Sequence, residues 1–445
     1  MLENNNIGLK RVFTLFDSTM INVGTIIGSG IFLVPMTVAL YLESSFLMAS
    51  VWIIAGVVTL LGALSMAELG AAMPESGGQY VYLKEAYGPI WGFLYGWAAF
   101  TVINSASIAA IAVAFATYLK YFHAFTPLEV KLIAIFSIAA FTVLNSLHLR
   151  SGVWAQNVMT FTKVGVLFAF VVFGLTFEGG SSTNFLPLMT AGSFSSFVKP
   201  FSLALVAVLW TYDGWIEVTY VGGEIKNPGK NIPLSLLYST ILLILLYLAV
   251  NFVYVYLLSI SGIATSELVA SEAAQVILGP QGVTLVILAI LLSTIGAVNV
   301  NVIAAPRIYH AMAIEKLFFS SAAKIHPVYG TPVASLLIQG IWASILVFTG
   351  TFDQLITYVV FTSWIFYAMS CGSVIVLRKT RPNMERPYKT WGYPYVPIIF
   401  IIFAIFLVGI TLINDTRDSL IGIGLILLGV PVYYLRVNSF KGKTG

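Results

Sequence analysis

Long apolar runs, separated by short polar or Gly/Pro-rich segments, divide the chain into twelve predicted membrane spans. Each run has about 20 residues, the length that a helix needs to cross roughly 30 Å of hydrocarbon. The pattern therefore predicts an all-α polytopic membrane protein. The spans lie near residues 12–38, 46–72, 88–118, 130–148, 154–177, 199–223, 232–258, 281–306, 332–350, 355–378, 394–414 and 419–436.

The first span contains glycines where a continuous membrane helix would avoid them. Residues 23–32 read VGTIIGSGIF, with Gly24, Gly28 and Gly30 close together. Unwound backbone at membrane depth is tolerated only where protein buries it or where it lines a watery cavity, because unpaired amides are costly in hydrocarbon. The pattern predicts a helix that is broken near the membrane midplane, with a small-molecule site at the break.

A second interruption is predicted five spans later. Residues 209–224 read LWTYDGWIEVTYVGGE, which mixes aromatic, acidic and glycine residues within a span. Breaks in spans one and six indicate two inverted repeats of five spans each. Close helix packing at the glycines is the plainer alternative, but packing does not require Asp213 beside Gly214. The expected organisation is a cytoplasmic N-terminus at 1–11, repeats at 12–177 and 199–379, spans eleven and twelve at 394–436, and a cytoplasmic C-terminus at 437–445.

Charge supports this topology. Only 9% of the residues are charged and 59% are hydrophobic, with a net charge of +4. With the N-terminus inside, seventeen of the 22 Lys and Arg residues fall in cytoplasmic segments, four fall outside and Lys163 lies within a span. The polar start leads directly into the first span, which predicts that no signal peptide is removed. We expect a multi-pass protein of the cell membrane with both termini cytoplasmic, and the basic balance needs no nucleic acid.

Other chemistry finds little support in the sequence. Cys371 is the only cysteine and the four His residues are scattered at span ends, so we expect no internal disulfide, metal or cofactor. No span pairs a nucleophile with a base, which disfavours an enzyme. An ion channel is the alternative of a different class, but the near absence of charge rings within the spans argues against it.

Several motifs together resemble one transporter family. In addition to Gly28-Ser29-Gly30, they are AELG at 67–70, PESGGQY at 74–80, YGP at 87–89, WTYDGW at 210–215, Glu224, NP at 227–228, NIP at 231–233, PR at 306–307 with Tyr309 and AMA at 311–313, RPYK at 386–389 and GYP at 392–394. This set resembles the L-type amino acid transporter (LAT) family of the amino acid-polyamine-organocation (APC) superfamily.

The resemblance implies a LeuT-like fold that moves amino acids by alternating access. It implies sodium-independent exchange of neutral L-amino acids, with cationic ones left open and proton-coupled symport as the alternative. Members that pair with a glycoprotein use a cysteine in the loop between spans three and four. Here residues 120–127 read KYFHAFTP, so we expect a stand-alone prokaryotic member without a disulfide-linked heavy subunit.

The first break offers opposite poles to a zwitterion. Backbone amides at the start of a half-helix, with the Ser29 hydroxyl, suit a carboxylate, and unpaired carbonyls suit an ammonium group. The resemblance implies that the substrate binds in this way, and that Trp210 is an aromatic gate over it. The expected substrate residues are Thr25, Ile26, Gly28, Ser29, Gly30, Trp210, Thr211, Tyr212 and Asp213.

Lys163 is the most informative charge. A cation in mid-span costs at least about 2.5–3.5 kcal/mol, so it should face the protein interior. Sodium-coupled relatives of this architecture bind a cation between spans one, five and eight. Lys163 would replace that ion by touching carbonyls near Gly28, with Ser293 or Thr294 beside it. A fixed charge and a titrating group both stay open, and snorkelling to an interface is the plainer reading.

Three acidic residues follow in span six. Asp213 could contact the substrate ammonium or a cationic side chain, or cap the second half-helix. Glu217 departs from the family pattern, which leaves the substrate range open. Glu224 precedes the Asn227-Pro228 loop and is expected to be a cytoplasmic gate or a loop anchor.

Overall fold

The computed structural model describes residues 9–147, 149–186, 194–266, 268–349 and 352–441, and apart from one isolated bridge every regular element in these ranges is helical. The α-helices are α1 (Leu15–Ile26), α2 (Gly30–Leu42), α3 (Ser45–Ala72), α4 (Gln79–Tyr87), α5 (Pro89–Ala98), α6 (Asn104–Tyr118), α7 (Pro127–Leu147), α8 (Leu149–Thr176), α9 (Phe194–Thr211), α10 (Pro228–Leu257), α11 (Ile260–Thr265), α12 (Val269–Leu278), α13 (Pro280–Ala304), α14 (Pro306–Ile314), α15 (Val333–Thr349), α16 (Phe352–Thr380), α17 (Tyr395–Asn414), α18 (Thr416–Leu427) and α19 (Gly429–Lys441).

The predicted spans correspond to these helices. Within the described ranges, nine helical stretches are long and apolar enough to cross a membrane, and the bent pair α1 and α2 forms a tenth. Two shorter apolar helices, Phe197–Thr211 and Val333–Phe348, lie where spans six and nine were predicted. The prediction of an all-helical polytopic fold is confirmed. The inverted repeat stays a prediction.

The break in the first span occurs where the glycines predicted it. Thr14 caps α1 through a reciprocal capping box with Asp17, and α1 ends at Ile26. After three residues α2 begins at Gly30, and the two helix axes differ by 42°. The backbone at 27–29 is therefore left outside either helix.

The second half of span six corrects the sequence expectation. We expected a second half-helix after Asp213, but α9 ends at Thr211 and short 3-10 turns at Glu217–Thr219 and Gly222–Glu224 follow. Gly214 takes a φ of +94°, which ends helical geometry and suits glycine. The Val218 amide then donates to Asn22 Oδ1 on α1 at 3.0 Å, so the tertiary contact replaces a helical hydrogen bond.

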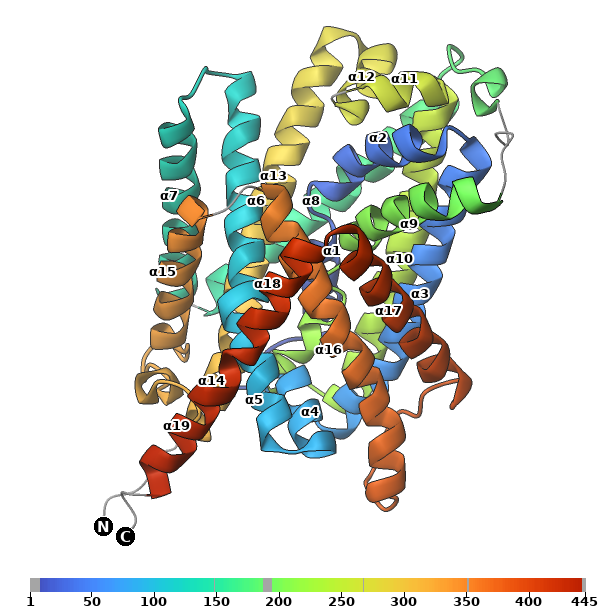
Figure 1. Ribbon diagram of the computed structural model, residues 1–445. Helices are drawn as coiled ribbons and strands as arrows, with labels where there is room; N and C mark the ends of the chain where they lie inside the picture. Colours follow the sequence, from blue (N-terminus) through green and yellow to red (C-terminus); the bar gives the residue numbers. More distant parts are fainter. Residues whose placement is uncertain (1–8, 148, 187–193, 267, 350–351, 442–445) are drawn as a thin grey trace.

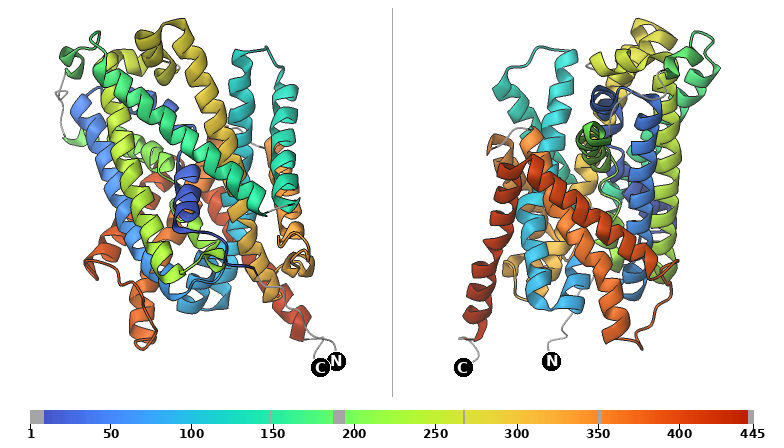
Figure 2. Two further views of the ribbon diagram at one scale, coloured as in Figure 1. Left: turned by 180° about the vertical axis from the view of Figure 1, so that it is seen from behind. Right: turned by 45° about the vertical axis from the view of Figure 1, so that its right-hand side comes forward.

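The two broken segments lie in the middle of the molecule. Helices α7 and α15 pack together at one side, α3 and α10 at the other, and α1 contacts α8, α10 and α13 between them (Figures 1 and 2). Helices α3 and α10 approach closely because Gly56 and Gly70 carry no side chain toward Ile244 and Ile232. We call the face that holds α4 and the end of α19 the terminal face; it is at the bottom of Figure 1.

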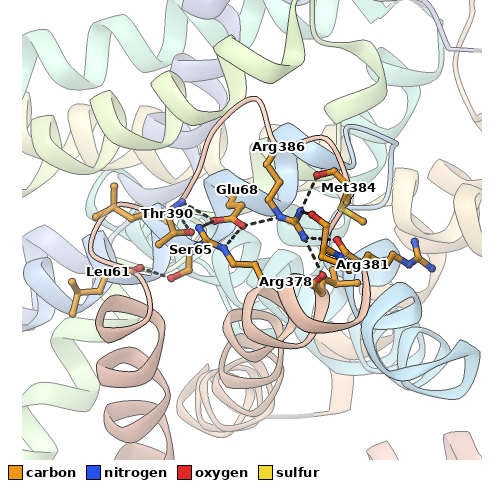
Figure 3. A network of polar contacts seen from close by, with 11 residues as sticks. Leu61, Ser65, Glu68, Arg378, Arg381, Met384, Arg386 and Thr390 are labelled. Atoms are coloured by element: carbon orange, nitrogen blue, oxygen red, sulfur yellow. Dashed lines mark hydrogen bonds and ion pairs between the residues drawn. The ribbon is translucent and has the colours of Figure 1, made fainter.

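A buried carboxylate ties the terminal ends of α3 and α16 to the loop that follows α16. Glu68 accepts two hydrogen bonds from Arg378, at 2.8 and 2.7 Å, and one from the Thr390 amide at 2.6 Å. Arg386 Nε lies 3.3 Å from the same carboxylate, so the side chains converge from three segments (Figure 3). The RPYK motif thus belongs to a structural anchor.

We expect Glu68→Gln to destabilise the protein more than any charge removal on the nearby surface. Removing one partner of a buried pair costs about 3–5 kcal/mol, because the remaining charges lose their compensation. Thermal unfolding of the purified protein in detergent measures this effect as a lowered midpoint.

Glu85→Gln is the matched control. Its carboxylate pairs with Arg381 at 2.6 Å and Lys84 at 3.3 Å, but these side chains are 21–48% exposed. Partial burial raises the pKa of Glu85, and hydrogen bonds from Arg381 and Lys84 outweigh it and lower the pKa overall. Exposed pairs contribute about 0–1 kcal/mol. Equal midpoints for both variants would show that the Glu68 network is not a stability anchor.

Candidate functional site

A cavity of about 60 Å³ lies beside the break between α1 and α2. One water needs roughly 10–15 Å³ on this measure, so several waters or a small molecule would fit. No lining residue is basic. The lining residues are Thr25, Ile26, Gly28, Ser29, Gly30, Ser107, Ile111, Trp210, Thr211, Asp213, Gly214, Glu217 and Asn301.

The start of α2 presents free donors to this cavity. In the described part of the chain, the amides of Ser29 and Gly30 donate no hydrogen bond to protein. Helix α2 has 13 residues, so its N-terminal dipole adds a favourable field for an anion. The Gly28 amide is already used, because it donates to Ile26 O at 2.9 Å. Two of the three predicted amides are therefore available.

The predicted carbonyl acceptors are only partly free. Ile26 O accepts from the Gly28 amide and from the Tyr247 hydroxyl at 3.0 Å, and Trp210 O accepts from the Asp213 amide at 3.0 Å. Thr25 O, by contrast, accepts no hydrogen bond within the ranges that the structure covers. The ammonium group of a zwitterion would find its acceptor at the end of α1.

Lys163 on α8 contacts the same break but does not line the cavity. Its Nζ donates to Gly24 O at 3.0 Å and Ile27 O at 2.9 Å, and the residue is 3% exposed. Gly24 and Gly296 leave room for α8 and for the lysine stem, since a Cβ at Gly296 would lie 2.9 Å from Lys163 Cε. The ammonium thus holds carbonyls that the helix break exposes.

The two predicted partners of Lys163 behave differently. Ser293 Oγ lies 2.9 Å from both Ile27 O and Gly28 O, so it shares the carbonyl cluster. Thr294 instead bonds to Ile290 O within its own helix and does not join the cluster. No group of three His, Cys, Asp or Glu residues in the described ranges could hold a metal ion.

Tyr212 is not at the cavity, although the sequence placed it there. Its ring is buried against Trp52 on α3 and Tyr247 on α10, with centroid distances of 6.0 and 5.1 Å. The turn after Thr211 directs alternate residues to opposite sides, so Thr211 and Asp213 line the cavity and Tyr212 packs behind it. Trp210 does line the cavity, as predicted.

Some cavity residues were not among the predicted substrate residues. Glu217 lines the wall, and its Oε2 lies 3.3 Å from Thr25 Oγ1. Beside it, the predicted residue Asp213 accepts a hydrogen bond of 2.6 Å from Tyr367 on α16. Ser107 and Asn301 complete the wall from α6 and α13. A polar side chain in an otherwise apolar span was the available signal for both, but many such residues serve packing.

Glu224 joins the end of span six to α14. It is fully buried and pairs with Arg307 of α14, with Nε to Oε1 at 2.7 Å. Its carbonyl accepts from the amides of Val12 and Phe13, and Phe13 forms a bridge with Ile225. The segment before α1 is thereby attached to the end of span six.

Comparison with known proteins now identifies the family. A family profile described as amino acid permease matches residues 13–433. The chain belongs to the amino acid permease family. The family and its relatives are transporters and not enzymes.

Three relatives in this family are exchangers or transporters by name. The serine/threonine exchanger SteT of Bacillus subtilis is 33% identical over 430 residues, 96% of this chain and 97% of that protein. The human b(0,+)-type amino acid transporter 1 is 33% identical over 443 residues, which are 98% of this chain and 90% of that protein. The human cystine/glutamate transporter is 31% identical over 433 residues, which are 96% of this chain and 85% of that protein. The permease is thus similar to these proteins over nearly its whole length.

Proposed function

We propose that this permease exchanges small neutral L-amino acids across the cell membrane by alternating access, without sodium. The observation that carries the proposal is the cavity at the helix break. Free amides of Ser29 and Gly30 suit the substrate carboxylate, and the free carbonyl of Thr25 suits its ammonium group. Backbone groups recognise what all amino acids share, so the cavity walls select the side chain.

The size of the cavity and the similarity to SteT favour a small substrate. Trp210 and Ile111 narrow a cavity of about 60 Å³, which suits a side chain such as that of serine. SteT, which matches almost end to end, is by name a serine/threonine exchanger. Cationic amino acids are the second candidate, because Asp213 and Glu217 give the wall two carboxyl groups and no basic residue.

The position of Lys163 supports the proposal of sodium independence. Its ammonium group contacts the carbonyls of Gly24 and Ile27, the kind of ligand that would otherwise coordinate a cation at this break. A covalently attached charge cannot be carried across the membrane with the substrate. We therefore favour a fixed charge and exchange over symport.

The terminal face is proposed to face the cytoplasm. Helix α4, which carries Lys84, and the end of α16, which carries Arg378 and Lys379, lie at this face (Figure 1), in agreement with the bias of basic residues to the inside. The Glu224–Arg307 pair then forms the inner gate, and Trp210 the aromatic gate beside the substrate. The only cysteine is buried in α16, which favours action without a disulfide-linked subunit.

The proposal predicts serine exchange in vesicles that contain no sodium. Purified permease is reconstituted and loaded either with L-serine or with buffer, and uptake of labelled L-serine is followed in choline medium. We expect rapid uptake only in serine-loaded vesicles. Accumulation in empty vesicles under an inward proton gradient would instead establish a symporter, and an absolute need for sodium would refute the role of Lys163.

A decarboxylated analogue provides a sharper control. Ethanolamine is serine without its carboxylate, so it cannot use the amides of Ser29 and Gly30. We expect unlabelled L-threonine to compete with labelled L-serine and ethanolamine to fail. Competition by ethanolamine as strong as that of threonine would show that the carboxylate is not bound at the start of α2.

A further inference from the structure

The Thr25 hydroxyl has two oxygen neighbours and only one proton. Its Oγ1 lies 2.8 Å from Ile21 O, one turn earlier in α1, and 3.3 Å from Glu217 Oε2. A hydroxyl donates a single hydrogen bond. The closer contact is the bond from a threonine to the carbonyl four residues before it, which is common within helices. The Thr25 proton is therefore directed toward Ile21.

The contact between Thr25 and Glu217 then needs a proton from Glu217. Two oxygens that both act as acceptors repel each other at this distance. A protonated carboxyl group, by contrast, donates its O–H to the free lone pair of the Thr25 hydroxyl. The arrangement of Ile21, Thr25 and Glu217 is thus a chain of hydrogen bonds that starts at a neutral Glu217.

Asp213 has the opposite surroundings. It accepts a hydrogen bond of 2.6 Å from the Tyr367 hydroxyl, a length typical of a bond to an ionised carboxylate. Asp213 and Glu217 both line the same cavity. Two carboxyl groups that share one site do not readily ionise together, so one proton is held between them. The hydrogen bonds place that proton on Glu217.

No cation near Glu217 offsets a negative charge there. Glu217 is 5% exposed, and in the described ranges no Lys, Arg or His pairs with it. Helices α1 and α10 pack against the turn that holds Glu217, and neither contributes an ionisable partner to it. Lys163 on α8 donates to backbone carbonyls and not to Glu217. The titratable groups that interact electrostatically with Glu217 are Asp213, Tyr95, Tyr220, Tyr309 and Tyr367.

We propose that Glu217 is the proton-binding residue of the substrate cavity and is neutral whenever a neutral amino acid is bound. The role of Glu217 in transport rests on the proposed function. The protonation of Glu217 does not rest on it, because the hydrogen bonds alone carry that inference. Loss of the proton would put a second negative charge beside Asp213 and oppose binding of the substrate carboxylate. Exchange of neutral amino acids should therefore fall as Glu217 ionises.

Infrared spectroscopy tests the protonation directly. The permease in lipid nanodiscs and its Glu217→Gln variant are compared at about pH 7 by subtracting one spectrum from the other. We expect the difference to contain the C=O band of a protonated carboxyl group, shifted in D2O. Glu272→Gln removes an exposed carboxylate on α12 and should yield the bands of an ionised carboxylate. Ionised-carboxylate bands in the Glu217→Gln difference would overturn the proposal.

Serine exchange tests the consequence for transport. Glutamine mimics the neutral acid, so Glu217→Gln should keep at least about half of the exchange at about pH 6 and stay constant up to about pH 9, where the unmodified permease declines. A loss of more than about tenfold in the variant at low pH, or a parallel decline of both proteins, would overturn the proposal. If neither protein exchanges any amino acid, the proposed function fails and the infrared result alone decides the protonation.

Discussion

Replacing Lys163 with alanine is expected to reduce serine exchange by about 100-fold, because a displacement of about 1 Å at a binding site can have that effect. The substitution removes the donor to Gly24 O and Ile27 O, the carbonyls on which the shape of the helix break depends. Gly24 O would be left without a partner, which costs about 1–3 kcal/mol for a buried carbonyl, whereas Ser293 Oγ would remain beside Ile27 O. Counterflow in sodium-free proteoliposomes measures the loss.

Two further variants separate charge from packing. Lys163→Met keeps the length of the side chain without its charge and should lose as much exchange as the alanine variant. Thr162→Ala changes the exposed neighbour, whose hydroxyl bonds only to Val158 O of its own helix, and should exchange at the normal rate. Normal exchange in both Lys163 variants would contradict the role of a fixed charge.

Replacing Gly30 with alanine is expected to abolish most exchange while the protein still folds. A Cβ at Gly30 would lie 2.7 Å from Thr211 Oγ1 and 2.8 Å from Thr211 Cγ2. The added methyl group would force α2 and the end of α9 apart, and overpacking of this kind costs about 1–3 kcal/mol. Because both helix ends line the cavity, the displacement acts on the substrate site itself. Exchange rate and thermal unfolding are measured on the same preparation.

Relief of the contact provides the internal control. Thr211→Ser removes the Cγ2 atom, so it should restore part of the exchange in the Gly30→Ala background. Gly409→Ala on α17 has no atom within 4 Å of the added methyl group and should be neutral. If Gly30→Ala leaves exchange intact, or if Thr211→Ser restores none of the lost exchange, the two helix ends do not form the substrate site as described.

The first break could be predicted from sequence because its cause is local. Gly28, Ser29 and Gly30 interrupt an apolar run, and backbone in a membrane cannot unwind without a reason. A buried cation must find acceptors, and the family resemblance implied that those of Lys163 lie at this break. The structure brings both together, while their roles in binding and coupling stay predictions.

The region after Thr211 could not be predicted in the same way. The sequence alone does not show that the Val218 amide bonds to Asn22, or that Tyr212 turns toward Trp52. Those contacts join residues 196 and 160 positions apart in the chain, and they override the local preference for a half-helix. Glu217 shows the same limit, because its partner on α1 becomes visible only in the folded chain.

The most direct test of the account is an experimental structure of the permease with bound L-serine. We predict the substrate in the cavity between α1, α2 and the turn after α9. Its carboxylate should lie within hydrogen-bond distance of the Ser29 and Gly30 amides, with its ammonium group toward Thr25 O. Serine bound elsewhere, or in this cavity with the ammonium group at the start of α2, would contradict the account.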